Sequence, residues 1–123
     1  MSRLNDKKAV VPKWYLTGKR ETSVKHAKLR MLCSNLNDHL FSYIHVIDTP
    51  SCICGHVREN NRHYLLDCPM YYAERNEMLN ELQGIGFQAN LQNLLYGNSQ
   101  YSDECNIQAF DIIQKFINAT DRL

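Results

Sequence analysis

Residues 52–69 read CICGHVRENNRHYLLDCP, and this stretch decides how the chain is organised. It holds Cys52, Cys54, His63 and Cys68 in the spacing C-x-C-x8-H-x4-C. Thiolate and imidazole are ligands that tetrahedral Zn2+ prefers, and four of them leave no open position for water or substrate. The stretch therefore predicts one structural zinc ion per chain, bound by a CCHC motif and without a catalytic role.

The residues around the histidine suit such a site. Residues 59–61 are of helix-capping types and precede an apolar turn at residues 64–66, which places His63 on a helix. Pro69 disfavours the α conformation at Cys68 and can open the next helix. The ion is therefore expected to pin a short, irregular Cys-x-Cys turn to the junction of two helices.

Other interpretations of the cluster stay open. Free cysteine is often a small core hydrophobe, so a packed cluster without metal is one alternative, and a reactive thiol is another. His56 is a rival ligand, but one residue separates it from Cys54, which crowds the chelate, so we rank it below His63. Five cysteines without an apolar signal segment or a transmembrane run argue against a disulfide framework. We therefore expect a reducing, intracellular compartment, nucleus or cytoplasm, and no membrane partner.

Apolar residues recur at three- and four-residue steps along most of the chain, which is typical of amphipathic helices. The segments are those near residues 22–32, 36–47, 72–82, 87–95 and 107–117. Gly84 and Gly97 are expected to end helices, and Ser102 to cap the last one. The expected fold is mainly α: one small helical zinc-binding domain over residues 18–123, preceded by a basic tail, residues 1–17, that we expect to be flexible.

The net charge of +1 hides an uneven distribution. Residues 1–30 hold nine Lys or Arg and two acidic residues, a net charge of +7, so residues 31–123 carry −6. A basic front end beside an acidic body indicates either a surface for polyanions or two matched surfaces. Trp14 and Tyr15 lie among the basic residues, where their rings either stack on bases or anchor the segment in the core.

Several stretches share the pattern of one protein family. They are Gly18-Lys19-Arg20, residues 26–30 and 33–41, the Cys-x-Cys-Gly, Glu-Asn, His-Tyr-Leu-Leu and Cys-Pro motif of residues 52–75, and residues 94–97 and 116–123. Together, over roughly residues 12–123, they resemble the C-terminal region of LINE-like (non-LTR) retrotransposon reverse transcriptase proteins from invertebrates. The resemblance implies a CCHC zinc-knuckle-like motif that helps to hold RNA or DNA. It implies for the four ligands only the role of a scaffold for contacts made by other residues.

Catalytic signatures are missing from the sequence. There is no Y-x-D-D polymerase motif, and the acidic residues are scattered instead of forming a metal-binding cluster. Cys33 or Cys105 acting as a nucleophile with a histidine is the remaining enzymatic alternative, but neither has an oxyanion-hole or orienting signature nearby. The chain is therefore not expected to be an enzyme.

Two functions follow from these patterns. The first is a zinc-stabilised nucleic-acid-binding module that contacts the backbone of RNA or DNA. Its candidate contact residues are Lys19, Arg20, Lys25, Lys28, Arg30, Arg58 and Arg62. The second is a protein-interaction or architectural module, in which the acidic body docks a basic partner such as a polymerase or endonuclease domain.

Overall fold

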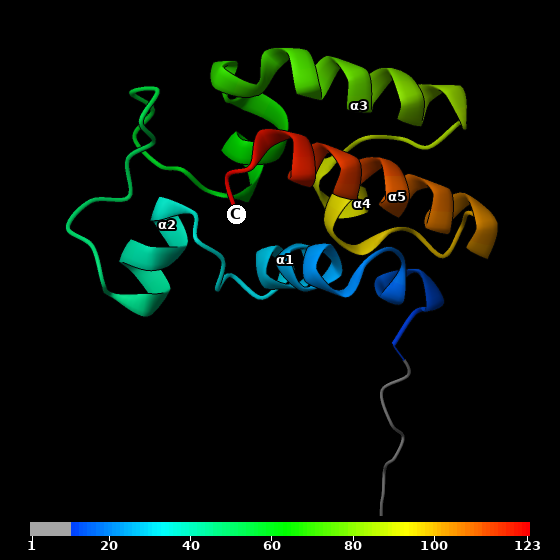
Figure 1. The fold of residues 1–123 in the computed structure, drawn as a ribbon, viewed down its shortest axis with the longest axis horizontal. Coiled ribbons are helices and arrows are strands. Elements are labelled where there is room, and N and C mark those ends of the chain that lie inside the picture. The colour runs from blue at the N-terminus through cyan, green and yellow to red at the C-terminus, as the bar shows by residue number, and fades with distance from the viewer. Residues whose placement is uncertain (1–10) are drawn as a thin grey trace, which may run out of the picture.

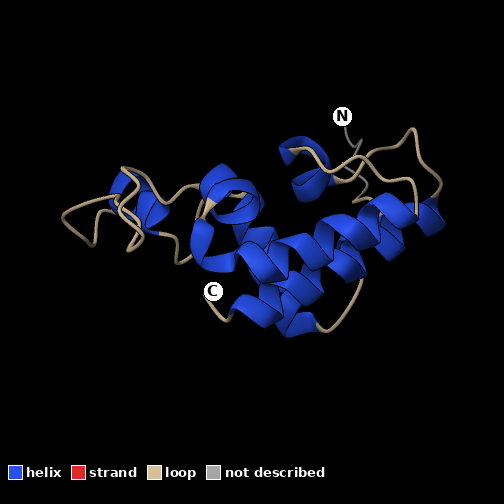
Figure 2. Cartoon of the chain, turned by 90° about the horizontal axis from the view of Figure 1, so that it is seen from above, coloured by secondary structure: helices blue, strands red, loops and turns tan. Residues whose placement is uncertain are grey.

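The computed structural model describes residues 11–123, and every regular element in that range is a helix (Figures 1 and 2). The α-helices are α1 Arg20–Arg30, α2 Asn37–His39, α3 Tyr72–Gly84, α4 Leu91–Tyr96 and α5 Asp103–Thr120. The 3-10 helices are η1 Lys13–Leu16 and η4 Pro69–Tyr71, and the π-helices are η2 Leu40–Ile44 and η3 His63–Asp67. This confirms the expectation of a mainly α fold. Within residues 11–123, no helix combines the length and the apolar character needed to cross a membrane.

The longest helix, α5, is the centre of the molecule. Its apolar stripe is buried as the periodicity predicts, and α3 and α1 pack against it from two sides (Figure 1). Ser102 caps its first turn, because the side-chain oxygen accepts a hydrogen bond from the Cys105 backbone N–H at 3.1 Å. The buried core residues of α5, α3 and α1 are Ala109, Phe110, Ile113, Phe116, Ile117, Met78, Leu82 and Leu29.

Part of the segment assigned to a flexible tail packs in the core instead. Trp14 is buried in η1 and its indole N–H donates to the Tyr96 carbonyl at 2.8 Å. Tyr15 stacks on Phe110 of α5, with ring centroids 6.0 Å apart. The two aromatic side chains supply apolar area that outweighs the polarity of their neighbours, so they are core anchors and not free to stack on bases. The rest of the predicted tail, residues 1–10, lies outside the described range.

The segment expected as a helix over residues 36–47 is shorter and irregular. Leu36 is fully buried just before α2. The π-helix η2, which continues α2, ends at Ile44, because the next residue, His45, adopts a left-handed conformation with φ of 63°. Ile44 is 40% exposed, so the predicted apolar stripe does not continue into the core. Periodicity alone does not show that the chain leaves the bundle at this point.

Residues 37–62 form an arm that projects from the helical bundle, and we call it the metal arm (Figures 1 and 2). In the described chain, the hydrophobic core includes Leu36 and resumes at Tyr64, with no residue between them. Several large apolar side chains of the arm face solvent, among them Ile53 at 83% exposure. Apolar burial therefore does not hold the arm in place.

Candidate metal centre

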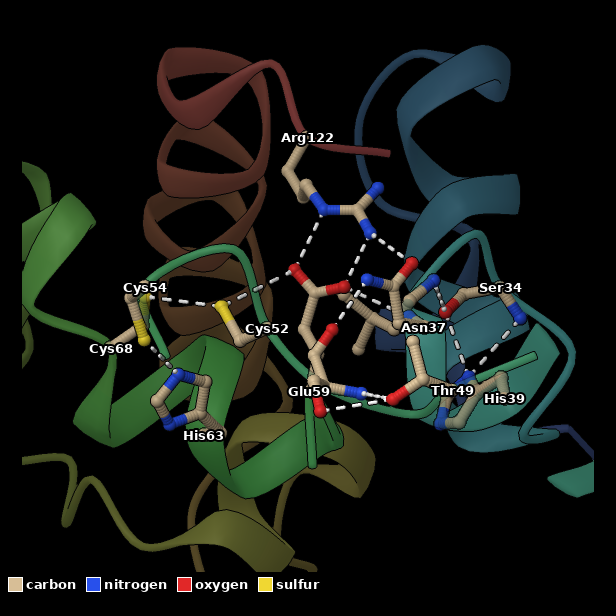
Figure 3. Close-up of polar contacts among 12 residues, drawn as sticks. Ser34, Asn37, His39, Thr49, Cys52, Cys54, Glu59, His63, Cys68 and Arg122 are labelled. Atoms are coloured by element: carbon tan, nitrogen blue, oxygen red, sulfur yellow. Dashed lines mark hydrogen bonds and ion pairs between the residues drawn. The ribbon is translucent and has the colours of Figure 1, made fainter. Parts of the chain in front are cut away.

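The four predicted ligands come together at the junction between the metal arm and the bundle (Figure 3). Their donor atoms all lie within 4.8 Å of one another. The sulfurs of Cys52 and Cys68 are 3.8 Å apart, and the Cys54 sulfur lies 3.2 Å from His63 Nε2. The four side chains are therefore close enough to bind one metal ion.

Cys52 and Cys54 are presented by a tight turn in the metal arm. The Gly55 backbone N–H donates to the Cys52 carbonyl at 2.9 Å, and the Cys52 N–H donates to the His56 carbonyl at 2.9 Å. Gly55 has φ of 104°, a conformation that only glycine adopts at low cost. This turn places both sulfurs close to the donor atoms of His63 and Cys68.

His63 and Cys68 are brought together by the π-helix η3. The Cys68 N–H donates to the His63 carbonyl at 2.6 Å, the i to i+5 bond that defines a π turn. The Asn60 side chain caps the start of η3 by accepting from the His63 N–H at 2.9 Å. The H-x4-C spacing thus corresponds to one turn of π-helix, which places residues five apart on the same side.

The environment of the donors fits a metal ion. Burial lowers the pKa of His63, which favours the neutral imidazole that metal ions bind. His63 Nε2 faces the cysteine sulfurs, whereas its Nδ1 is buried with no hydrogen-bond partner among residues 11–123. Burial also raises the pKa of Cys52 to about 12 and raises that of Cys68. Thiols with a raised pKa are poor nucleophiles, which argues against the reactive-thiol alternative for these two cysteines.

Cys54 differs from the two buried cysteines. It is half-buried, and a hydrogen bond from the His56 backbone N–H lowers its pKa. The His56 side chain is exposed and does not belong to the group of converging donors. Its ring stacks on the His63 ring instead, with centroids 4.2 Å apart and planes at 14°. His56 therefore packs beside the centre.

Arg75 supports the centre, a role that sequence reasoning missed. Its side chain is 5% exposed and donates to the carbonyls of Leu65 at 3.0 Å, Cys68 at 2.7 Å and Tyr64 at 2.9 Å. These carbonyls lie in η3 and at its end, and the Cys68 carbonyl also accepts from the Tyr71 N–H of η4 at 3.3 Å. The signal was present in the sequence, because Arg75 falls on the apolar stripe of the segment at residues 72–82.

Glu59 also has a role that its position in the sequence did not indicate. It is 2% exposed, and its carboxylate accepts from the Asn37 N–H at 2.8 Å and from Arg122 Nε at 2.7 Å. It does not cap η3, which Asn60 does. The pairing with Arg122 joins residues 63 positions apart, so no local pattern could reveal it.

The seven basic residues proposed to contact nucleic acid divide into two groups. The guanidinium of Arg30 lies 4.1 Å from the Tyr15 ring centroid, and Arg58 and Arg62 form ion pairs with acidic neighbours. The remaining four lie on or just before α1, exposed or half-buried, and form no ion pair with another residue of the described range. These four are Lys19, Arg20, Lys25 and Lys28.

Neither of the other cysteines is part of the centre. Cys33 is exposed, and Cys105 is half-buried with its sulfur 3.9 Å from the Ile85 carbonyl. Neither joins a cluster of three or more metal-ligating side chains within residues 11–123. The structure therefore adds no support for a nucleophilic role of either thiol.

Comparison of the chain with protein-family models, with curated proteins and with solved structures finds no match. The likeness to reverse transcriptase tails therefore stays a prediction from the sequence motifs.

Proposed function

We propose that the chain is a zinc-stabilised, non-catalytic nucleic-acid-binding module of the kind that the reverse transcriptase tail resemblance implies. The observation that carries this proposal is the convergence of Cys52, Cys54, His63 and Cys68 within 4.8 Å. Three sulfurs and one imidazole fill a tetrahedral coordination sphere and leave no position for substrate. The ion is therefore assigned a structural role, and binding is assigned to the surrounding surface.

The spacing of the donors favours zinc. Two sulfurs at about 2.3 Å from a tetrahedral ion lie about 3.8 Å apart, and the Cys52 and Cys68 sulfurs are separated by 3.8 Å. Soft thiolate ligands also disfavour magnesium and calcium, which prefer oxygen. We therefore assign the site to one Zn2+ ion per chain.

The ion compensates for the lack of a core in the metal arm. It joins two ligands of the arm, Cys52 and Cys54, to His63 in η3 and Cys68 at its end, where the chain packs on the bundle. A structural zinc site contributes on the order of 10 kcal/mol of apparent binding free energy. That is comparable to the total stability of a typical domain, about 5 to 15 kcal/mol, so the arm is expected to fold only with the ion bound.

Metal analysis of the purified protein tests the zinc assignment. We expect about one zinc per chain, and loss of that zinc in Cys68→Ser. Cys33→Ser is the matched control, because Cys33 is an exposed cysteine outside the cluster. Zinc retained in Cys68→Ser, or absent from the wild-type protein, contradicts the assignment.

The basic face of α1 supports nucleic-acid binding. Lys19, Arg20, Lys25 and Lys28 supply positive charges that neutralise phosphates. The exposed aromatic residues of the described chain lie elsewhere, at Tyr43, Tyr72 and Tyr96. Because no base-stacking side chain accompanies the charges on α1, we assign the contacts to the phosphate backbone and expect little dependence on base sequence.

A salt titration with labelled duplex DNA and RNA tests this assignment. The affinity is expected to fall with salt by about 0.9 in log-log slope for each phosphate neutralised on duplex DNA. The double variant Lys25→Gln/Lys28→Gln should therefore reduce the slope by about 1.8. The control is Lys115→Gln, because Lys115 is already paired with Glu77 and Glu81. Absence of binding at low salt, or binding that salt does not weaken, contradicts the proposal.

The exposed apolar residues of the metal arm favour a second candidate function, protein interaction. Val46, Ile53 and Val57 are 63%, 83% and 72% exposed and all belong to the metal arm. Exposed apolar side chains that lie within reach of one another are typical of interaction surfaces. In this function the module docks a basic partner such as a polymerase or endonuclease domain. Ile53→Asp should weaken protein docking without changing nucleic-acid affinity, whereas the α1 double variant should do the reverse. If the Ile53→Asp variant binds the polymerase domain and the endonuclease domain as tightly as wild type does, this function is contradicted.

A further inference from the structure

We infer that Glu59 and Arg122 form the outer shell of the metal centre, in which Arg122 offsets the charge of a buried carboxylate and so sets the affinity for the ion. This inference rests on the proposed metal site. It assigns a function to the end of the chain, about which the ligand motif says nothing.

Glu59 lies between the metal ligands and the end of α5 (Figure 3). Its Oε2 is 3.9 Å from the Cys52 sulfur and 2.7 Å from Arg122 Nε. Its Oε1 accepts from Arg122 Nη2 and, at 2.8 Å, from the Asn37 backbone N–H. The carboxylate is therefore held in contact with both a ligand and an arginine.

The charges at this point need compensation. A divalent ion with three thiolates carries a net charge of −1, and the Glu59 carboxylate adds another −1 beside Cys52. Glu59 is 2% exposed, so water screens the repulsion poorly. Arg122 is the cation that pairs with this carboxylate. Metal binding converts three neutral thiols into thiolates and so gives the site a net charge of −1. Without Arg122, the buried Glu59 carboxylate repels this charge and weakens metal binding.

The same contacts fix the metal arm to the bundle. The Glu59 backbone N–H donates to the Pro50 carbonyl at 2.7 Å, and Arg122 Nη2 donates to Asn37 Oδ1 at 3.3 Å. The Asn37 side chain also donates to the Ser51 carbonyl at 2.7 Å, next to the first ligand. Arg122, just after α5, thus binds both chain segments at the base of the arm, at Asn37 and Glu59, which pre-positions Cys52 for the ion. Outer-shell partners of this kind change metal affinity by about 10- to 100-fold when they are removed.

Zinc affinity, measured by competition with a chromophoric chelator, tests the inference on the full chain. Arg122→Gln should bind zinc about 10- to 100-fold more weakly than wild type, and Arg122→Lys should lose less because it keeps the charge. The Co2+ absorption spectrum shows whether each variant keeps three sulfur ligands. Lys115→Gln is the control, since it removes a cation of α5 that pairs with α3 and not with the arm.

A second substitution separates charge from packing. Glu59→Gln in the Arg122→Gln background removes the uncompensated carboxylate, so this double variant should regain affinity relative to Arg122→Gln alone. If it binds no better, charge compensation is overturned. If Arg122→Gln, with its helix content intact by circular dichroism, binds zinc as tightly as wild type, the outer-shell role is overturned while the metal site stands. If wild type binds no zinc, the proposed function itself fails.

Discussion

At the scale of single residues, His26 is a buried imidazole held in its neutral form. Its Nε2 lies 2.8 Å from the Leu94 carbonyl, and its Nδ1 is 3.5 Å from the Gln114 amide nitrogen. The first contact requires a proton on Nε2 and leaves Nδ1 to accept. The ring packs 4.4 Å from that of Phe110, and burial lowers the pKa of His26 to about 4.

This pKa predicts acid sensitivity. Between about pH 6.5 and pH 4 the unfolded chain binds a proton at His26 and the folded chain does not, so stability falls as pH falls. The slope from this residue approaches about 1.4 kcal/mol per pH unit. Chemical unfolding of wild type and His26→Gln at pH 7, 6 and 5 measures it. The variant should show the shallower dependence, and parallel curves would contradict the assignment.

Arg75 carries a second prediction at this scale. Arg75→Met removes the side-chain donor from the carbonyls of Tyr64, Leu65 and Cys68, of which Cys68 keeps the Tyr71 N–H at 3.3 Å. A buried carbonyl left unpaired costs about 1 to 3 kcal/mol where no water replaces the donor. The free energy of unfolding by denaturant should fall by several kcal/mol. Lys28→Met, at an exposed position, should change it by less than about 0.5 kcal/mol. Equal effects of the two substitutions would rule out that the hydrogen bonds of Arg75 to these carbonyls stabilise the fold.

At the scale of elements, α1 and α5 begin in different ways. Ser102 caps α5 with its side chain, whereas Lys19 at the start of α1 has extended backbone angles but makes no capping hydrogen bond. The Lys19 carbonyl already accepts the first helical bond, from the Ser23 N–H at 2.9 Å. The position therefore has the geometry of a cap and lacks only the side-chain oxygen.

A pair of substitutions tests this difference. Lys19→Ser should raise the free energy of unfolding by about 0.5 to 1 kcal/mol, and Ser102→Ala should lower it by about 1 kcal/mol. Thermal unfolding of both variants beside wild type measures the two changes. A Lys19→Ser protein that is less stable than wild type would show that the lysine contributes something that the contacts do not reveal.

The same scale shows how far the sequence predicts the fold. Period-3.6 patterns located α1, α3, α4 and α5 because each buries one face, and Ser102 marked the start of the last helix. The pattern over residues 36–47 misled because apolar side chains there face solvent. The role of Trp14 stayed open in the sequence because its hydrogen-bond partner, the Tyr96 carbonyl, lies 82 positions away.

The four converging donors were predictable from their spacing, since a π turn and a glycine turn bring them together locally. The choice of His63 over His56 also followed from chelate geometry. The pairing of Glu59 with Arg122 could not be predicted from the sequence, because it depends on how α5 packs and joins residues 63 positions apart. Local spacing thus predicts the donor cluster, and tertiary packing determines the residues that surround it.

At the scale of the whole molecule, the bundle and the metal arm depend on different forces. Helices α1, α3, α4 and α5 share the hydrophobic core, whereas residues 37–62 contribute nothing to it. The arm relies on hydrogen bonds, the ion pair of Glu59 with Arg122, and the proposed ion.

Chelation should therefore unfold one part of the protein and spare the other. Removing the metal is expected to abolish amide-exchange protection over residues 37–62 while α5 stays protected. Hydrogen exchange followed by NMR, with and without chelator, measures this residue by residue. Uniform loss of protection along the chain would mean that the ion holds the bundle as well.

The placement of Leu36 and Tyr64 in one core has a further consequence. The segment before the arm supplies α1, the segment after it supplies α3, α4 and α5, and these helices pack together through non-covalent core contacts. A single tryptic cut at Arg58 or Arg62 would thus yield two peptides that stay associated through their shared interior. Association of the two cut peptides would show that the shared core alone, without the arm's backbone, holds the bundle together.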